Sequence, residues 1–400
     1  MTAIVSEPTK KELKIFPPFE VPNRLLFSPG PTPVPPSVLQ AMTKTVLGHL
    51  DPRFLQCMDE IKEMLKYVFE TDNRLTLPVS GTGSAGMEAA IFNAIEPGDD
   101  VVVCPMGVFG ERMLAIVERT PANPVVVRAE WGNQIDLKQI EAAMKSCKPR
   151  VLALVHVETS TGVAQNLEGL AELAHRYDAL LIVDAVASLS GQAVDVDKHQ
   201  IDICYSGSQK CIGAPPGLAP ITFSERAVQR LRGRQTKVQS WYFDIAMVEQ
   251  YWGKERTYHH TAPISMNYAL HEALRLICEE GLEARFARHL KAHQALVAGL
   301  DAMGLKLLTA PENRAIVVNA VSVPEGLDGN RCRMRLLNDH NIEIAGGLGH
   351  LKGKIWRIGL MGESSQKANV LRLLDALHQT LIAEGYNCES GVEAAEKIFV

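Results

Sequence analysis

The sequence predicts an α/β protein with a mostly parallel central sheet, a smaller C-terminal α+β domain and an extended N-terminal arm. Short apolar runs such as VVVC, VLALV and LLIVD are continuous rather than alternating, as in strands that are covered on both faces. Helical patterns separate these runs, which indicates right-handed crossovers between parallel strands. The 400 residues, 46% of them hydrophobic, suffice for large buried cores, so we expect two domains.

The N-terminal segment is rich in proline, as in FPPFEVPN and SPGPTPVPPS. Proline favours extended backbone, so residues 1–40 are predicted to form an arm that lies against a larger body or a partner. A helical pattern follows from about Val38 to Phe69. Beyond it, β-rich runs alternate with helical ones, and we assign residues 41–282 to the large domain.

Two long helical patterns, MNYALHEALRLICEEGL and RFARHLKAHQALVAGLDAMGL, predict a bridge between the domains. The remaining strands and helices, among them AIVVNAVSVP and KIWRIGLMG, are of the α+β type. We therefore place the small domain at residues 283–400.

The composition indicates which classes of partner the protein binds. The net charge is −5 and no basic cluster is present, which disfavours nucleic acid and anionic membranes and leaves small molecules. The sequence has neither a signal-peptide pattern nor an apolar run long enough to span a bilayer, so a cytoplasmic location is expected. The eight cysteines form no Cys-x-x-Cys pair, and we expect no metal site and no disulfide framework.

Two charged residues follow predicted strands. Asp184 ends LLIVD, and Lys210 comes after IDICYSG, so both should reach the edge where the parallel strands end. A carboxylate can keep a pyridinium nitrogen protonated and a lysine can form a Schiff base, which are the groups that pyridoxal phosphate needs. Acids at strand ends are common in α/β enzymes, so this pair alone does not decide the function.

A glycine-rich loop supplies a third element. In PVSGTGSAGMEAAIF, the residues Thr82, Gly83 and Ser84 lie between a strand and a helix, where free amides and hydroxyls favour a phosphate. Simple N-capping by Ser84 is an equally good reading of the same residues. A dinucleotide site is disfavoured because no G-x-G-x-x-G motif follows a strand with an acidic residue about 20 positions later.

The chain contains, in this order, SGTGSAGMEA, VHVETSTGV, LLIVDAVAS, YSGSQKCIGAPPG, YHHT and WRIGLMG. This set closely resembles the class V aminotransferases of pyridoxal-phosphate fold type I, especially the alanine–glyoxylate and serine–pyruvate aminotransferases. The resemblance extends from about Val21 to Gly385. It implies pyridoxal 5'-phosphate as cofactor, an internal aldimine on Lys210 and a contact between Asp184 and the pyridine nitrogen.

Other cofactor contacts are implied by the same resemblance. Thr159 would touch the phenolic oxygen, Gln209 would contact the phosphate, and Phe109 would stack on the ring where many members have tryptophan. A lone phenylalanine is otherwise more often a core residue, and Thr159 could be an ordinary turn hydroxyl. Ser84 stands where many members have histidine, which leaves the preferred amino donor open.

The resemblance also implies a substrate site. Arg357 in KIWRIGLMG matches the position that binds the substrate carboxylate, for which the planar guanidinium suits a bidentate contact. By itself, an arginine in an apolar strand is about as often part of a structural ion pair. The backbone around Ser28 and Gly30 would line the pocket, with Ser28 replacing a glycine of many animal members.

A shared active site is the last implication. In RTYHHTAPISM, Tyr258 and Thr261 match residues that reach the cofactor phosphate of the neighbouring subunit in the resembling enzymes, which predicts a homodimer. The pair His259 and His260 fits hydrogen-bonded structure better than a metal site, because no further ligand spacing accompanies it.

The expected activity is transfer of the amino group of alanine or serine to glyoxylate or pyruvate in a ping-pong cycle. A cysteine desulfurase-like lyase is the alternative, but it needs a mobile cysteine, and the plausible candidate Cys332 lies in an apparent helix. A non-catalytic regulator that binds pyridoxal phosphate is disfavoured because no DNA-binding extension is present.

Overall fold

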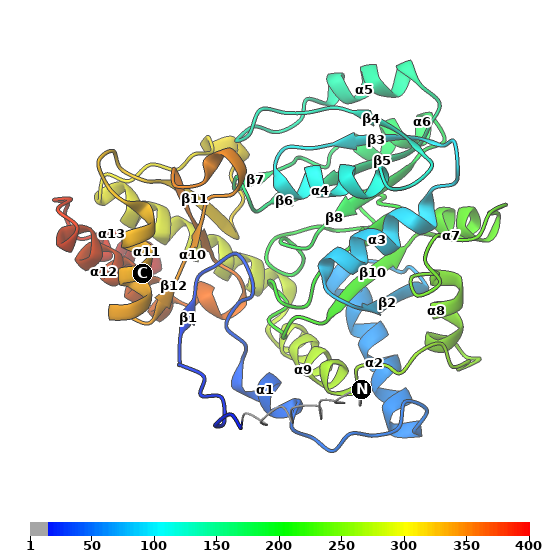
Figure 1. Cartoon of the computed structure of the whole chain (residues 1–400), viewed down its shortest axis with the longest axis horizontal. Coiled ribbons are helices and arrows are strands. Elements are labelled where there is room, and N and C mark those ends of the chain that lie inside the picture. Colours follow the sequence, from blue (N-terminus) through cyan, green and yellow to red (C-terminus); the bar gives the residue numbers. More distant parts are fainter. Residues whose placement is uncertain (1–14) are drawn as a thin grey trace, which may run out of the picture.

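The computed structural model describes residues 15–400, and a central sheet dominates it (Figure 1). Within these residues, seven strands lie in the order β2, β10, β9, β8, β5, β3, β4. Strand β10 is antiparallel to both neighbours and the other adjacent pairs are parallel, which confirms a mostly parallel sheet. The strands are β2 Leu75–Ser80, β3 Asp100–Cys104, β4 Asn123–Val126, β5 Pro149–Val155, β8 Leu180–Asp184, β9 Ile203–Tyr205 and β10 Leu218–Phe223.

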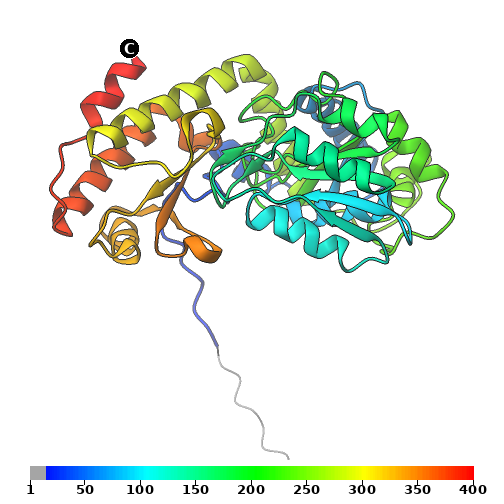
Figure 2. The same ribbon diagram turned by 90° about the horizontal axis from the view of Figure 1, so that it is seen from above.

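Helices lie on both sides of this sheet (Figures 1 and 2). Every residue of β8 is buried, which explains why its sequence is a continuous apolar run ended by one carboxylate. A short hairpin, β6 and β7, follows β5. The remaining elements of this part are α3 Gly83–Ala94, α4 Val108–Val117, α5 Leu137–Ser146, β6 Val157–Glu158, β7 Val163–Ala164, α6 Leu170–Arg176, α7 Glu225–Arg232 and α8 Ile245–Trp252.

The prediction of a continuous helical segment from Val38 to Phe69 is wrong in its middle. Two helices, α1 Pro36–Ala41 and α2 Pro52–Phe69, are separated by a non-helical segment. Asp51 has extended backbone, as expected before proline, and its carboxylate accepts a hydrogen bond from the Arg53 amide as the N-cap of α2. The capping pair Asp51 and Pro52 therefore starts a new helix.

The C-terminal part is built on the two predicted bridging helices, α9 Ile264–Glu280 and α10 Leu282–Ala302. They meet at Gly281, whose positive φ of 78° suits glycine. An antiparallel sheet in the order β11, β14, β13 packs with the helices that follow. The remaining elements of the C-terminal part are β11 Val318–Ser322, α11 Gly329–Asp339, β12 Ile342–Glu343, β13 Ala345–Gly346, β14 Ile355–Gly359, α12 Lys367–Ala383 and α13 Val392–Phe399, with short 3₁₀ turns at Pro311–Asn313, Gly349–Leu351 and Gly362–Ser365.

Two separate clusters of buried hydrophobic side chains underlie these parts. One includes residues from Val38 to Leu282, and the other joins Phe27 to residues from Ala292 to Ala395. A smaller cluster joins Ala187 and Cys211 to Val317 and Met361, and the domain limits 41–282 and 283–400 stay a proposal.

The described part of the arm crosses between the two clusters. Strand β1, Leu25–Leu26, pairs in parallel with β12, and the chain then turns through Gly30 to α1, which packs on α9. Residues 1–14 of the predicted arm lie outside the described residues. No helix within residues 15–400 is long and apolar enough to cross a membrane.

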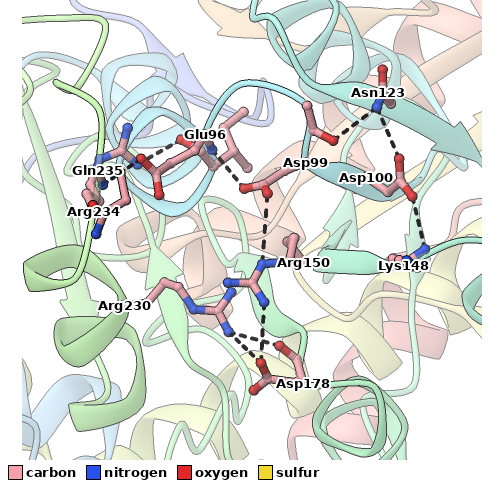
Figure 3. A network of polar contacts seen from close by, with 12 residues as sticks. Glu96, Asp99, Asp100, Asn123, Lys148, Arg150, Asp178, Arg230, Arg234 and Gln235 are labelled. Carbon is pink, nitrogen blue, oxygen red and sulfur yellow. Dashed lines mark hydrogen bonds and ion pairs between the residues drawn. The ribbon is translucent and has the colours of Figure 1, made fainter.

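A polar network ties together the amino ends of the strands, opposite the end at which Asp184 lies (Figure 3). Asp178, just before β8, accepts hydrogen bonds from Arg150 of β5 and from Arg226 and Arg230 of α7. Asp99 adds a second carboxylate 3.9 Å from the Arg150 guanidinium. This network fastens β5, β8 and α7 at the end of the sheet away from Asp184.

Candidate active site

A pocket lies at the carboxyl ends of the parallel strands. The loops after β2, β3, β8 and β9 and the turn after β5 supply its walls, as the doubly wound topology predicts. The lining residues are Thr82, Gly83, Ser84, Met87, Phe109, Arg112, Val155, Val157, Thr159, Asp184, Val186, Ala187, Gln209 and Lys210. The structure therefore brings together the eight residues, from Thr82 to Lys210 in the sequence, that were predicted as cofactor contacts.

Lys210 is buried in a turn that begins after β9 ends at Tyr205, so it lies several residues beyond the strand rather than directly after it. Its Nζ donates a hydrogen bond to the carbonyl oxygen of Pro29. Burial, followed by the charge of Arg357, lowers the pKa of the Lys210 amine to about 8. A lowered pKa makes the neutral, nucleophilic amine accessible near neutral pH.

Asp184 is the last residue of β8, and both of its carboxylate oxygens accept hydrogen bonds. The Val186 amide donates to Oδ1 at 2.8 Å, and the Tyr205 hydroxyl donates to Oδ2 at 2.9 Å. Burial raises the pKa of Asp184 to about 6, while these two hydrogen bonds oppose the rise. The carboxylate is thus held in place beside the pocket by a backbone and a side-chain donor.

The glycine-rich loop opens helix α3 toward the pocket. Thr82 is the N-cap and has no side-chain capping hydrogen bond, so the alternative prediction of capping by Ser84 is wrong. The Ser84 hydroxyl instead accepts a hydrogen bond from Arg112 at 3.2 Å. The first amides of an α-helix have no intrahelical partner, and those of Gly83 and Ser84 lie at the pocket wall, where an anion is favoured.

Phe109 is positioned by a buried carboxylate. Glu158 accepts hydrogen bonds from the amides of Phe109 and Gly110 at the start of α4, at 2.9 and 3.1 Å. It also accepts the Ser160 hydroxyl at 2.6 Å, and that Ser160 oxygen accepts the Val108 amide. Negative charge at a helix N-terminus is stabilising, so Glu158 fixes the turn that carries the aromatic ring.

Arg357 lies in β14 beside the pocket rather than in its lining. Its guanidinium donates to the carbonyl oxygens of Gly346 and Thr159, at 2.7 and 3.1 Å. Among the described residues, no carboxylate lies within ion-pair distance of it. Burial lowers the pKa of Arg357 to about 10, although Glu158 opposes this effect, and the group remains a cation at neutral pH.

The turn of the arm covers Lys210. Gly30 has a φ of 90°, and a Cβ at this position would lie 2.4 Å from the lysine Nζ, so glycine is required both by the backbone and by the close approach. Ser28 is buried and donates a hydrogen bond to Glu343 at 3.1 Å. Ser28 and Arg357 line a second pocket next to the first.

Tyr258 and Thr261 do not line the pocket of their own chain. Their hydroxyls are 3.3 Å apart, and Tyr258 is 54% exposed. The neighbouring histidines form a hydrogen-bonded chain, because His259 Nδ1 lies 2.8 Å from His260 Nδ1 and His260 Nε2 lies 2.7 Å from the Ser80 hydroxyl. The histidine pair thus joins the segment that contains Tyr258 to β2, the strand that leads into the glycine-rich loop.

Comparison with known proteins decides the family. The family model for class-V aminotransferases matches residues 24–360. This chain belongs to the class-V aminotransferases. An (S)-ureidoglycine–glyoxylate transaminase of Bacillus subtilis is 42% identical to it over 388 residues, which cover 92% of this chain and 93% of the relative. An alanine–glyoxylate aminotransferase of Felis catus is 42% identical over 368 residues, 91% of this chain and 89% of the relative.

Solved structures confirm fold type I for this aminotransferase. The alanine–glyoxylate aminotransferase of Nostoc sp. is 48% identical, with a TM-score of 0.91 over 94% of this chain and 100% of the other. The ureidoglycine–glyoxylate aminotransferase of B. subtilis has a TM-score of 0.93 over 95% and 99% of the two chains. A cysteine desulfurase of Thermococcus onnurineus shares the fold alone, at 16% identity.

The aminotransferase depends on pyridoxal phosphate, and the pocket fits that group. Gln209 lies at the pocket wall and its buried side-chain oxygen has no hydrogen-bond partner in the described protein; its amide nitrogen, rather than this acceptor oxygen, would donate to a phosphate. A Cβ at Gly83 would lie 3.0 Å from Val186, so the loop approaches this side chain closely. When bound, the cofactor acts as an electron sink for charge that develops at the substrate Cα.

Sequence reasoning missed several residues that line or support the aminotransferase site, and four of them bear on its chemistry. Arg112 and Val186 line the pocket, while Glu158 and Tyr205 hold residues that do. The spacing of three between Phe109 and Arg112 was an available signal, since it places both on one helix face. Glu158 and Tyr205 lie in quoted motifs, but their burial becomes visible only in the fold.

Proposed function

We propose that this aminotransferase moves the amino group of a small neutral amino acid, alanine or serine, to glyoxylate or pyruvate in a ping-pong cycle. The observation that carries the proposal is the position of Arg357. A buried guanidinium that has no carboxylate partner in the described protein, and whose charge lowers the pKa of Lys210, suits the carboxylate that amino donor and keto acceptor share.

Each residue of the site would then have its own role in the reaction. Arg357 would orient the substrate carboxylate, Lys210 Nζ would accept and return the proton at the substrate Cα, and Asp184 would contact the pyridine nitrogen. Thr82, Gly83, Ser84 and Gln209 would hold the phosphate, and Phe109 and Thr159 the ring and its phenolic oxygen. Ser28 and Gly30 would shape the substrate side of the site.

The acceptor assignment draws on the relatives named for glyoxylate. The donor is less constrained, because the same relatives act on alanine or on ureidoglycine. We favour alanine and serine, in agreement with the sequence prediction, and treat ureidoglycine as the competing donor.

A desulfurase activity is disfavoured by the position of Cys332. This thiol is fully buried in α11, and burial raises its pKa, whereas a persulfide-forming nucleophile needs an accessible, low-pKa thiol.

The proposal is tested with a half-reaction screen. The purified holoenzyme is mixed with single amino acids, and the change in cofactor absorbance is followed; the amino form is then mixed with glyoxylate, pyruvate, oxaloacetate and 2-oxoglutarate. We expect alanine and serine to give the highest kcat/KM among donors, and glyoxylate among acceptors. A preference for aspartate, ureidoglycine or an aromatic donor would contradict the donor assignment, and sulfide release from cysteine would favour the lyase.

We also propose that two copies of the chain share the active site. Tyr258 and Thr261 lie outside the pocket of their own chain, and several large apolar or aromatic side chains nearby are exposed, including Trp241 and Leu50. A homodimer in which Tyr258 and Thr261 reach the partner's cofactor phosphate accounts for both features. The cytoplasmic location and the absence of nucleic-acid partners remain predictions from the sequence.

A further inference from the structure

Asp184 and Tyr205 are side-by-side ends of neighbouring strands. In the parallel pair β8 and β9, Asp184 is the register partner of Tyr205, so their side chains project on the same face of the sheet. Tyr205 is fully buried and does not line the cofactor pocket, whereas Asp184 does. The tyrosine therefore touches the carboxylate from the protein side.

The hydroxyl of Tyr205 is the only side-chain donor to Asp184 among the described residues. It donates to Oδ2 at 2.9 Å, while the other donor, the Val186 amide, is fixed by the backbone. We propose that Tyr205 is a positioning residue, whose hydroxyl orients the Asp184 carboxylate toward the pyridine nitrogen and keeps it ionised. This inference rests on the role of Asp184 in the proposed function.

The charges around Asp184 explain why the Tyr205 hydroxyl matters to its ionisation. Burial raises the pKa of Asp184, and the nearby carboxylate of Glu158 raises it further, while the Lys210 ammonium lowers it. A hydrogen bond to the charged form is a further stabilising contact for the ion. Burial and the charge of Asp184 raise the pKa of the Tyr205 phenol, so this group stays protonated and remains a donor.

Packing fixes the direction of the hydroxyl. A Cβ placed on Gly86 of α3 would lie 3.3 Å from Cδ2 of the Tyr205 ring, so this glycine leaves the ring its space. The other side of β9 is paired with β10, in which Ile221 is the register partner of Tyr205. A ring packed beneath a helix and beside its register partner on a neighbouring strand has few rotamers, so its hydroxyl is aimed at Asp184 before the cofactor binds.

The test measures the affinity of the apoprotein for pyridoxal phosphate in a double-mutant cycle. Tyr205→Phe removes the hydroxyl and keeps the ring. We expect it to weaken cofactor binding about tenfold, the equivalent of one pKa unit, and to raise by about one pH unit the midpoint below which affinity falls. In an Asp184→Asn background, which has no carboxylate to ionise, the same change should have little further effect.

A matched control is Tyr251→Phe, which also deletes a buried tyrosine hydroxyl but whose acceptor is the backbone carbonyl of His49. It should leave the cofactor affinity and its pH midpoint unchanged. Replacing Tyr205 with 4-aminophenylalanine restores a donor and should recover most of the affinity, which a purely structural role would not require.

An equal loss in the wild-type and Asp184→Asn backgrounds, or no loss in either, would overturn the inference. If Asp184→Asn itself leaves cofactor affinity unchanged, the assignment of Asp184 fails and the role of Tyr205 fails with it. These readouts contain no substrate, so they are independent of which donor and acceptor the half-reaction screen identifies.

Discussion

At the scale of single residues, the pKa values of Lys210 and Asp184 are both shifted toward 7, one from above and the other from below. Burial lowers the pKa of Lys210 to about 8 and raises that of Asp184 to about 6. Near neutral pH, Lys210 is then partly neutral and can act as a base, whereas Asp184 is mostly ionised and can pair with a cation. The same burial leaves Arg357 charged, because its pKa of about 10 remains well above neutrality.

Arg357 provides the residue-scale prediction. Arg357→Leu should impair both half-reactions, since donor and acceptor share the carboxylate anchor, with a loss of about 2 to 5 kcal/mol in transition-state stabilisation. Single-turnover kinetics with alanine and with glyoxylate measure the two losses. Cofactor affinity is the control and should change little; a loss confined to the amino donor would show that another cation anchors the acceptor.

At the scale of elements, the carboxyl and amino ends of the parallel strands have different functions. The carboxyl ends carry the pocket, and the amino ends carry the Asp178 network of Figure 3. Individual exposed ion pairs contribute little, but Asp178 is the shared acceptor of three guanidiniums. Arg226 and Arg230 each also have a buried nitrogen without a partner in the described protein, and Arg150 has a second carboxylate, Asp99, at 3.9 Å.

We predict that Asp178→Asn lowers the free energy of unfolding by about 1 to 2 kcal/mol, because three cations lose their common counter-charge. Cofactor affinity should stay at the wild-type value, since the network lies at the opposite end of the sheet from the pocket. Urea unfolding and a cofactor titration check the two parts. Reduced affinity at unchanged stability would mean that the two ends of the sheet are coupled.

Sequence patterns predicted the structure well where a type of residue has a single structural or chemical role. Continuous apolar runs located the parallel strands, and Asp184, Lys210 and the glycine-rich loop located their functional edge. The break between α1 and α2 was missed although Asp51 and Pro52 mark it, because the apolar period continues across the loop. Glu158 was missed since a buried acid that caps a distant helix has no local sequence pattern.

At the scale of the whole molecule, buried neutral histidines connect stability to pH. Burial lowers the pKa of His156 to about 4 and that of His289 to about 3. His289 accepts the Gly362 amide at Nε2, so its neutral form is the one built into the fold. Between these values and the unfolded pKa of about 6.5, the unfolded chain binds protons that the native chain does not, so stability falls with falling pH.

We therefore expect urea unfolding to show lower stability at pH 5 than at pH 7, with up to about 1.4 kcal/mol per pH unit from each buried histidine. The raised pKa values of Asp184, Glu158 and Glu70 act in the opposite direction. The lowered pKa values of His260 and His293 act in the same direction as those of His156 and His289. His289→Gln should make the dependence shallower. An unchanged slope in this variant would show that His289 does not contribute.

The shared site is a prediction about the assembled molecule. Lys210→Ala and a Tyr258→Phe/Thr261→Ala variant should each be inactive, or seriously impaired at the cofactor concentration used. Mixed under conditions that exchange subunits, they should regain activity, because a mixed dimer contains one site with an intact lysine and an intact partner-supplied phosphate contact. With exchange demonstrated by mass spectrometry, no recovery would place Tyr258 and Thr261 in the site of their own chain.

Covalent labelling can show whether Lys210 carries the cofactor. The purified enzyme with pyridoxal phosphate is reduced with borohydride, digested and mapped by mass spectrometry. We expect the phosphopyridoxyl mass on Lys210, no label at this site in Lys210→Ala, and loss of transamination in that variant. A label on a different lysine, or ordinary transamination by Lys210→Ala, would contradict it.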